Sequence, residues 1–259
     1  MTLAAKATSP LLKQMILLAI QLNIFLAFKD KSVLMWFANR VARLFNPRFM
    51  TDYHTTSGST VYIISEEHAL ERQESTAKVM AHEYTHIHDR RRVNTWLYSA
   101  GYLFPQILAL PALGHLLVGF LFSFPMPNRV LAWVGLVTGL ATAATLGAVF
   151  IGTWTLILFA FIAFLAPLPA PWRTKWELRG YMMSLAMNYW RYGSIRDESM
   201  DWIEKQFTGP GYYFMWPFKK SARKKLEKAA TAVTSGVVLL DPFFKLVYEA
   251  VQASRKEAD

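Results

Sequence analysis

The stretch that decides the fold is STAKVMAHEYTHIHDRRR, residues 75–92, which contains the pattern His82-Glu83-Tyr84-Thr85-His86. On a helix, His82 and His86 lie one turn apart on the same face, so both imidazoles can bind one metal ion. Glu83 is turned about 100° from His82 and can accept a proton from a water molecule held by that metal. The pattern therefore predicts a helix with two metal ligands and a general base. The alternative is a structural helix whose histidines are satisfied by other partners.

The third ligand must come from elsewhere in the chain. A metzincin would carry histidine ten residues after His82, but that position is Arg92, so this subclass is excluded. Asp89 lies on the ligand face, but an unbroken helix places it about 10 Å from His82 along the axis. We expect Asp89 to orient a ligand imidazole or to pair with the arginines at 90–92.

Glu177 is the better candidate for the third ligand. It opens a second helical stretch, on which Tyr181, Ser184 and Asn188 share its face. The alternative is that Glu177 lies at the surface and pairs with a lysine or arginine. The chain has no cysteine, so a metal must be held by histidine and carboxylate, and Zn²⁺ is the expected ion.

The motif HEYTH, the strand-like segment before it and a glutamate on a later helix resemble a gluzincin metallopeptidase. Because long apolar stretches separate the two halves of the site, the layout is similar to that of the membrane-embedded heat-shock and prenyl-protein proteases. The resemblance covers about residues 58–92 and 172–192. It departs from the family three and four positions after Glu177, where Gly180 and Tyr181 replace an acidic residue.

The resemblance implies an α+β zincin-like domain, mainly α with a small β-sheet, and the activity of a zinc-dependent endopeptidase. It also implies that the β-branched segment 60–64 is an edge strand to which an extended substrate adds. An ordinary buried strand is the alternative. We expect the following helix to begin at Ser75 or Thr76, either of which can serve as its N-cap.

The expected reaction is hydrolysis of a peptide bond, with Glu83 as the general base and the metal on His82, His86 and Glu177. A group that stabilises the oxyanion is also required. Tyr181 is the first candidate for it, Arg179 the second and His88 the third. Together with Asp89, His88 is otherwise expected beside the metal ligands rather than on the metal.

The composition favours a membrane-associated protein. Hydrophobic residues make up 53% of the 259 residues and charged residues only 18%, and the formal net charge is +10. Such a positive charge suits an anionic partner. We expect that partner to be membrane lipid rather than nucleic acid, because the basic residues flank apolar runs and no nucleic-acid-binding module is visible.

Two long stretches, 93–128 and 130–172, carry no formal charge. A membrane-spanning helix needs about 20 apolar residues, and a shared metal requires an even number of crossings between His86 and Glu177. The sequence therefore predicts a transmembrane hairpin, out at 96–124 and back at 145–167. The basic residues beside both ends place the active site on the cytoplasmic side. A soluble helical bundle is the alternative.

The remaining segments are also expected at the membrane. Residues 11–28 predict one apolar helix that either spans the bilayer or lies in its surface. The aromatic run 212–218 followed by a basic cluster predicts an interfacial anchor, and residues 229–248 predict amphipathic helices broken at Gly236 and Asp241. The expected divisions are an apolar and basic N-terminal region (1–50), the two halves of the catalytic domain (51–95 and 173–210) around the hairpin (96–172), and an aromatic and basic C-terminal region (211–259).

A second hypothesis belongs to a different class of function. The chain could use a zincin fold only as a scaffold, in a membrane-inserting or virion assembly protein that binds protein partners and has no turnover. The large share of apolar and aromatic–basic segments supports this view. Metal content separates the two hypotheses, because a scaffold need not bind stoichiometric zinc.

Overall fold

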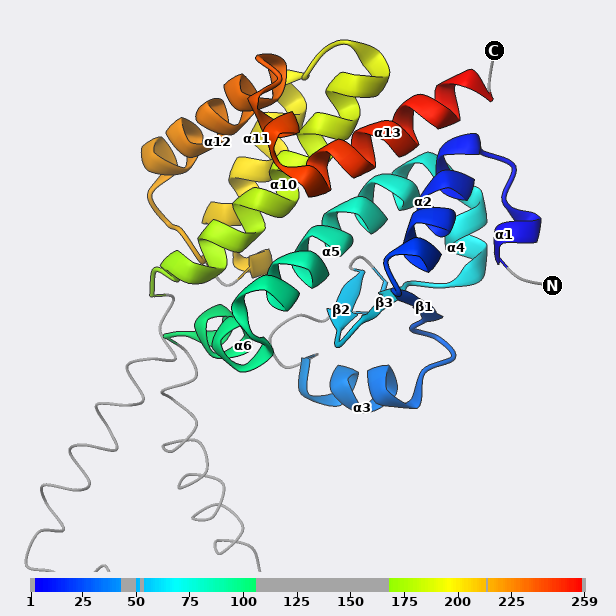
Figure 1. The fold of residues 1–259 in the computed structure, drawn as a ribbon. Helices are drawn as coiled ribbons and strands as arrows, with labels where there is room; N and C mark the ends of the chain where they lie inside the picture. Colours follow the sequence, from blue (N-terminus) through cyan, green and yellow to red (C-terminus); the bar gives the residue numbers. More distant parts are fainter. Residues whose placement is uncertain (1–2, 43–49, 52–53, 106–167, 213, 258–259) are drawn as a thin grey trace, which may run out of the picture.

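The fold was analysed in a computed structural model, which describes residues 3–42, 50–51, 54–105, 168–212 and 214–257. It is mainly helical with one small sheet (Figure 1). The elements are α1 (Leu3–Lys6), α2 (Pro10–Gln21), β1 (Phe25–Phe28), α3 (Val33–Ala42), β2 (Thr55–Ser57), β3 (Thr60–Ile63), α4 (Glu66–Glu71), α5 (Gln73–Val93), α6 (Thr95–Leu103), α10 (Pro171–Tyr192), α11 (Asp197–Thr208), α12 (Lys219–Thr234) and α13 (Pro242–Lys256), with short 3₁₀ turns at Pro210–Tyr212 and Val237–Leu240.

The long helices α5 and α10 pack against each other at the centre of the molecule (Figure 1). α5 begins at Gln73. Its N-cap residue is Arg72, whose side chain makes no capping hydrogen bond. The expected N-cap at Ser75 or Thr76 is therefore wrong, because both residues lie inside the first turn. Asn94 ends α5 with a φ of 110°, and its side chain accepts a hydrogen bond from the Trp96 amide, so one residue ends α5 and caps α6.

One hydrophobic core joins segments from both ends of the described chain. Buried side chains of α2, α5, α10 and α13 form it, among them Met15, Tyr84, Met183 and Phe244. The Tyr84 hydroxyl donates a hydrogen bond to the Met15 carbonyl at 3.0 Å, and burial holds the pKa of Tyr84 well above its usual value. A smaller cluster packs the other face of α10 against α11 and α12. Both faces of α10 are thus fixed, which fixes where Glu177 points.

The sheet has the strand order β1-β3-β2, with β1 parallel to β3 and β2 antiparallel to it. The strand expected at 60–64 is therefore present as β3, but it is the central strand. Its expected role as a substrate-binding edge is wrong, because β1 and β2 occupy its two sides. The edge strand beside α5 is β2.

The N-terminal segment 11–28 is not the single apolar helix that we expected. It forms α2, which ends at Gln21, and then β1. Leu11, Leu12 and Met15 of α2 are fully buried between α5 and α13, so the apolar side chains serve the core. Periodicity alone does not distinguish a short buried helix from an interfacial one.

No helix within the described ranges is long and apolar enough to cross a bilayer. The predicted hairpin at 96–124 and 145–167 lies outside the described residues, except for its start in α6 and Phe104–Pro105. At the C-terminal end, the predicted break is confirmed. α12 ends before Gly236, which has a φ of 78°, and the Asp241 side chain caps α13 by accepting a hydrogen bond from the Phe243 amide.

Candidate metal centre

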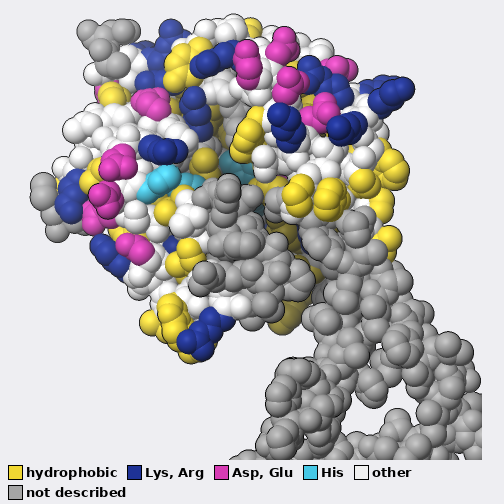
Figure 2. Space-filling view, turned by 180° about the vertical axis from the view of Figure 1, so that it is seen from behind, with side chains coloured by type: hydrophobic (Ala, Val, Ile, Leu, Met, Phe, Trp, Pro, Cys, Tyr) yellow, Lys and Arg dark blue, Asp and Glu magenta, His cyan; other side chains and the backbone are white. Residues whose placement is uncertain are grey.

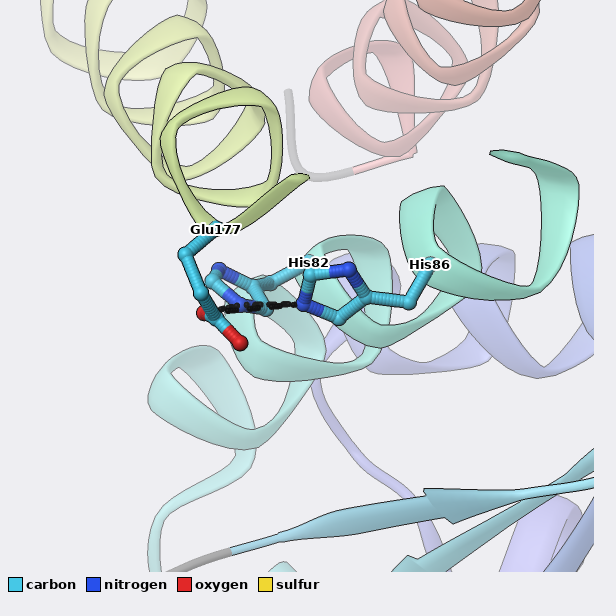
Figure 3. A group of neighbouring side chains, drawn as sticks. All are labelled: His82, His86 and Glu177. Carbon is cyan, nitrogen blue, oxygen red and sulfur yellow. Dashed lines mark hydrogen bonds and ion pairs between the residues drawn. The ribbon is translucent and has the colours of Figure 1, made fainter. Parts of the chain in front are cut away.

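Three buried side chains meet between α5 and α10. His82 and His86 project from α5, and Glu177 points down to them from α10 (Figure 3). The Nε2 atoms of the two histidines lie 3.0 Å apart, and Glu177 Oε2 lies 3.4 Å from Nε2 of His82 and 3.7 Å from Nε2 of His86. The side chains predicted as ligands, 91 residues apart at the closest, are thus brought together by the fold.

The donor set fits a zinc ion. Tetrahedral coordination with bonds of about 2.0–2.1 Å separates neighbouring ligand atoms by about 3.3 Å, close to the three separations in this cluster. Glu177 Oε2 is buried, and within the described residues it faces only the two imidazoles, at ion-pair distance. A cation between this oxygen and the two imidazoles would bind all three groups in place of a shared proton.

Hydroxyl groups lie on the far side of both imidazoles. The Tyr98 hydroxyl is 3.1 Å from His86 Nδ1, and the Ser184 hydroxyl is 3.4 Å from His82 Nδ1. The Ser184 hydroxyl donates a hydrogen bond to the Gly180 carbonyl, so its oxygen is available to accept a hydrogen bond from His82 Nδ1. A ring that donates from Nδ1 presents the lone pair of Nε2, which is the form that binds a metal.

Electrostatics hold the metal-free site in a charged form. Burial lowers the pKa of His86, but the Glu177 carboxylate outweighs burial and raises it to about 9. Burial would also raise the pKa of Glu177, yet the two histidines bring it below its usual range. A proton on the imidazole pair therefore balances the carboxylate when no metal is bound.

Gly180 and Tyr181, the two residues at which the sequence departs from the gluzincin pattern, both pack on His82. A Cβ at position 180 would lie only 2.7 Å from Cε1 of the His82 ring, so no larger side chain fits there without moving the ligand. The Tyr181 ring contacts His82 edge to face, with centroids 4.8 Å apart. In this chain, the two positions where gluzincins carry an acidic residue instead pack against the His82 ring and fix its position.

A cavity of about 420 Å³ opens beside the three ligands. Glu83 lies on its wall, and its carboxylate accepts a hydrogen bond from the Thr56 hydroxyl of β2. Thr55 and Thr56 bring the edge strand to the same wall. The sequence analysis missed Thr56, which lies on a strand of only three residues.

Two tyrosines of α6 were also missed. Tyr102 donates a hydrogen bond to Glu177 Oε1, the oxygen that faces away from the histidines, and Tyr98 contacts His86. The ring of Trp176, beside Glu177 in the sequence, packs on Tyr98 with centroids 4.2 Å apart and so joins α6 to α10. The spacing of four residues between the tyrosines was the available signal, but it lay inside a segment predicted to enter the membrane.

Other predicted residues lie outside the cavity wall. Arg179 Nε is 2.8 Å from Asp89 Oδ1, and its terminal nitrogen is 2.7 Å from Asp241 Oδ2. His88 Nδ1 lies 3.6 Å from Asp89 Oδ1, and the His88 ring stacks on Phe243. These residues link α5 and α10 to the start of α13. Asp89 therefore pairs with Arg179, whereas the sequence suggested that it orients a ligand imidazole or pairs with the arginines that follow it.

Two basic side chains of the N-terminal part, Lys29 and His54, have lowered pKa values. Lys29, which follows β1, is only 1% exposed, and burial lowers its pKa to about 8 although the charge of Glu83 acts in the opposite direction. Burial lowers the pKa of His54 to about 4, and the charges of His68 and Lys29 add to this effect. His54 also lines the cavity and is neutral at physiological pH.

Comparison with known proteins adds no further assignment. No protein-family model, no curated protein and no solved structure matches the chain. The likeness to gluzincins is therefore limited to the His82, His86 and Glu177 cluster, which could hold a metal ion.

Proposed function

We propose that this chain is a zinc-dependent metallopeptidase. The observation that carries the proposal is the convergence of two Nε2 atoms and one carboxylate oxygen in a buried cluster, with a further carboxylate, Glu83, on the wall of the adjoining cavity. Structural zinc sites usually have four protein ligands, whereas three ligands leave a position open for catalysis. Bound here, zinc would polarise a carbonyl group and make a water molecule more acidic.

The residues of the chain then have distinct roles. Glu83 accepts the proton of the attacking water, and the hydrogen bond from Thr56 holds its carboxylate in position. Tyr102 fixes Glu177 through Oε1, and the hydroxyls of Tyr98 and Ser184 fix the two imidazoles. Such fixed ligands reduce the reorganisation that the reaction requires.

We assign stabilisation of the oxyanion to Tyr212. Tyr181 packs behind His82, and Arg179 is held by two aspartates, so neither lines the cavity. Tyr212 does line it. Burial, the nearby Glu177 charge and a hydrogen bond with Tyr181 raise the pKa of Tyr212 well above its usual value, so its hydroxyl keeps its proton.

The test is the Glu83→Gln variant of the full chain. We expect it to bind zinc with the stoichiometry of the parent and to hydrolyse an unfolded protein substrate about 10²- to 10⁴-fold more slowly, the usual contribution of a general base. Hydrolysis at the parental rate would contradict the proposal. Parent protein that contains no zinc and shows no chelator-sensitive activity would instead support a scaffold role.

We also propose that the enzyme works at a membrane, with its site facing the cytoplasm and anionic lipid as a partner. Exposed apolar side chains support this, since Val33, Leu34, Trp36 and Phe37 of α3 and Trp96 and Leu97 of α6 are all at least half exposed. In Figure 2, hydrophobic side chains and a basic one project at the lower edge, where α3 lies. Arg40 stacks on Trp36 in this helix, an arrangement that suits an anionic interface.

The lipid proposal is tested by flotation of the purified chain with vesicles. We expect recovery with phosphatidylserine-containing vesicles to exceed recovery with phosphatidylcholine alone, and to fall when Trp36 and Arg40 are both replaced by serine. Equal recovery with both kinds of vesicle would exclude an anionic lipid preference.

A further inference from the structure

A cationic side chain, Arg90, lies on the wall of the cavity beside the metal ligands. It follows His82 and His86 on α5 at steps of four residues, so the three side chains project from one face of the helix. Arg90 lies about 6 Å beyond His86 along the axis. Neither the proposed metal site nor the proposed general base uses it.

Arg90 has no partner within the described part of the chain. No hydrogen bond or ion pair joins its guanidinium to a described residue, and its Nε atom is buried and unsatisfied. The next residue behaves differently, because Arg91 donates hydrogen bonds to the carbonyl groups of Leu22 and Asn23. A guanidinium that is half-buried without an acceptor loses hydration and gains nothing in return.

The carboxylates of the cavity are engaged elsewhere. Glu83 accepts from Thr56, while Glu177 is shared between Tyr102 and the two histidines. Neither carboxylate forms an ion pair with Arg90. The Arg90 guanidinium is therefore a planar donor without a partner in the described chain. Its geometry matches the two oxygens of a substrate carboxylate.

We propose that Arg90 binds a carboxylate of the substrate, and that the enzyme selects peptides carrying this group close to the scissile bond. The proposal rests on the proposed peptidase function and adds the substrate class. The midpoint of the two histidines is about 9 Å from Arg90 along α5, and an extended peptide advances about 3.3 Å per residue. The carboxylate is therefore about two or three residues from the bond that is cleaved. It is either the free C-terminus or an Asp or Glu side chain.

Equilibrium binding of short peptides to the full-length, zinc-loaded Glu83→Gln protein tests this without depending on turnover. The probes are fluorescein-labelled alanine hexapeptides in three forms: free C-terminal acid, C-terminal amide, and C-terminal amide with one glutamate placed at each position in turn. Fluorescence anisotropy gives Kd. We expect an acid form to bind on the order of ten- to a hundredfold more tightly than the neutral amide.

The variants assign this preference to one residue. Arg90→Gln should abolish the preference for the acid form. Arg90→Lys should retain part of it, because the positive charge remains but the bidentate hydrogen-bond geometry of the guanidinium is lost. Arg92→Gln is the matched control, since Arg92 is exposed on the same helix and does not line the cavity. It should leave the preference unchanged. Circular dichroism of each variant verifies that the fold is intact.

Each result of the binding experiment either supports or contradicts the role of Arg90. A preference confined to the free acid identifies the C-terminal carboxylate, and a preference confined to the glutamate series identifies an acidic side chain. Equal binding of acid and amide, or a preference that survives in Arg90→Gln, would overturn the proposal. A preference that depends on Arg90 in a protein whose Glu83 parent cleaves none of the peptides would leave the binding site standing and refute the peptidase function.

Discussion

At the scale of single residues, the position of the His82 ring depends on the absence of a side chain at position 180. The motif HEYTH was sufficient to predict both imidazoles and the general base, because one helical turn separates the ligands. Glu177 was expected to open a later helix, but α10 begins at Pro171, so Glu177 lies well inside it, and the fold brings it to the histidines. The role of Gly180 could not be predicted, since it requires the distance between two helices that are remote in the sequence.

The first prediction concerns Gly180→Ala. The added methyl group would lie 2.7–3.0 Å from the His82 ring, so the ring must move away from its place opposite Glu177. We expect zinc affinity to fall about 10- to 100-fold, the range found when the groups supporting a ligand are disturbed. Competition with a fluorescent zinc chelator measures it. Ala186→Gly, on the same helix and away from the ligands, is the control, and an unchanged affinity in Gly180→Ala would contradict the packing argument.

The second prediction concerns Tyr212→Phe. If the phenol donates a hydrogen bond to the oxyanion, removing it should lower kcat by about 10²- to 10³-fold while KM and zinc content stay close to those of the parent. Steady-state hydrolysis of a peptide with the parent and variant provides both constants. Tyr189→Phe is the control, because Tyr189 lies on α10 and does not line the cavity. A fall in zinc content would assign Tyr212 to the metal site instead.

At the scale of elements, Arg179 joins three helices. It bridges Asp89 of α5 and Asp241, the N-cap of α13, and the charge of Arg179 brings the pKa of Asp241 below its usual value against the effect of burial. The sequence marked Arg179 as a candidate for oxyanion stabilisation because it lies near Glu177. Proximity in sequence could not show that the side chain points toward α13, because the distant aspartate that holds it is 62 residues away.

The third prediction is that Arg179→Met lowers the free energy of unfolding by about 2–4 kcal/mol, since it leaves two largely buried carboxylates without their cation. Urea unfolding of the parent and variant measures the loss. Arg191→Met is the matched control, because Arg191 pairs with a more exposed glutamate, Glu74, and should cost less than about 1 kcal/mol. Equal losses of unfolding free energy in the two variants would show that the ion pairs of Arg179 stabilise the fold no more than an exposed ion pair does.

The edge of the sheet also shows what pattern alone can predict. β3 was recognised from its β-branched and aromatic residues, and the structure has it at Thr60–Ile63. Its position in the sheet was not recognised, because β1 pairs with it across more than thirty residues and had been read as part of an apolar helix. The strand order depends on these distant pairings, which local sequence does not contain.

At the scale of the whole molecule, burial of His54 predicts a loss of stability in acid. The ordinary histidine pKa is about 6.5 and that of His54 in the folded protein is about 4, so between these values the unfolded chain binds a proton that the folded chain does not. The free energy of unfolding therefore falls as the pH drops through this window, by at most about 3 kcal/mol from this group.

The His54→Gln variant tests this pH dependence. It cannot take up the proton, so its stability should fall less than that of the parent between about pH 7 and about pH 4.5. Urea unfolding at both pH values gives the two differences, in which the carboxylates common to both proteins cancel. The same loss in parent and variant would show that another group causes the acid sensitivity.

The central claim is that a carboxylate following the apolar midsection completes a metal site with the two imidazoles that precede it. Elemental analysis of the purified full-length chain tests it most directly, with Glu177→Ala beside the control Glu249→Ala, whose carboxylate is exposed on α13. We predict one zinc per chain in the parent and in Glu249→Ala, and little zinc in Glu177→Ala after dialysis. Equal zinc in all three proteins, or none in the parent, would contradict the account.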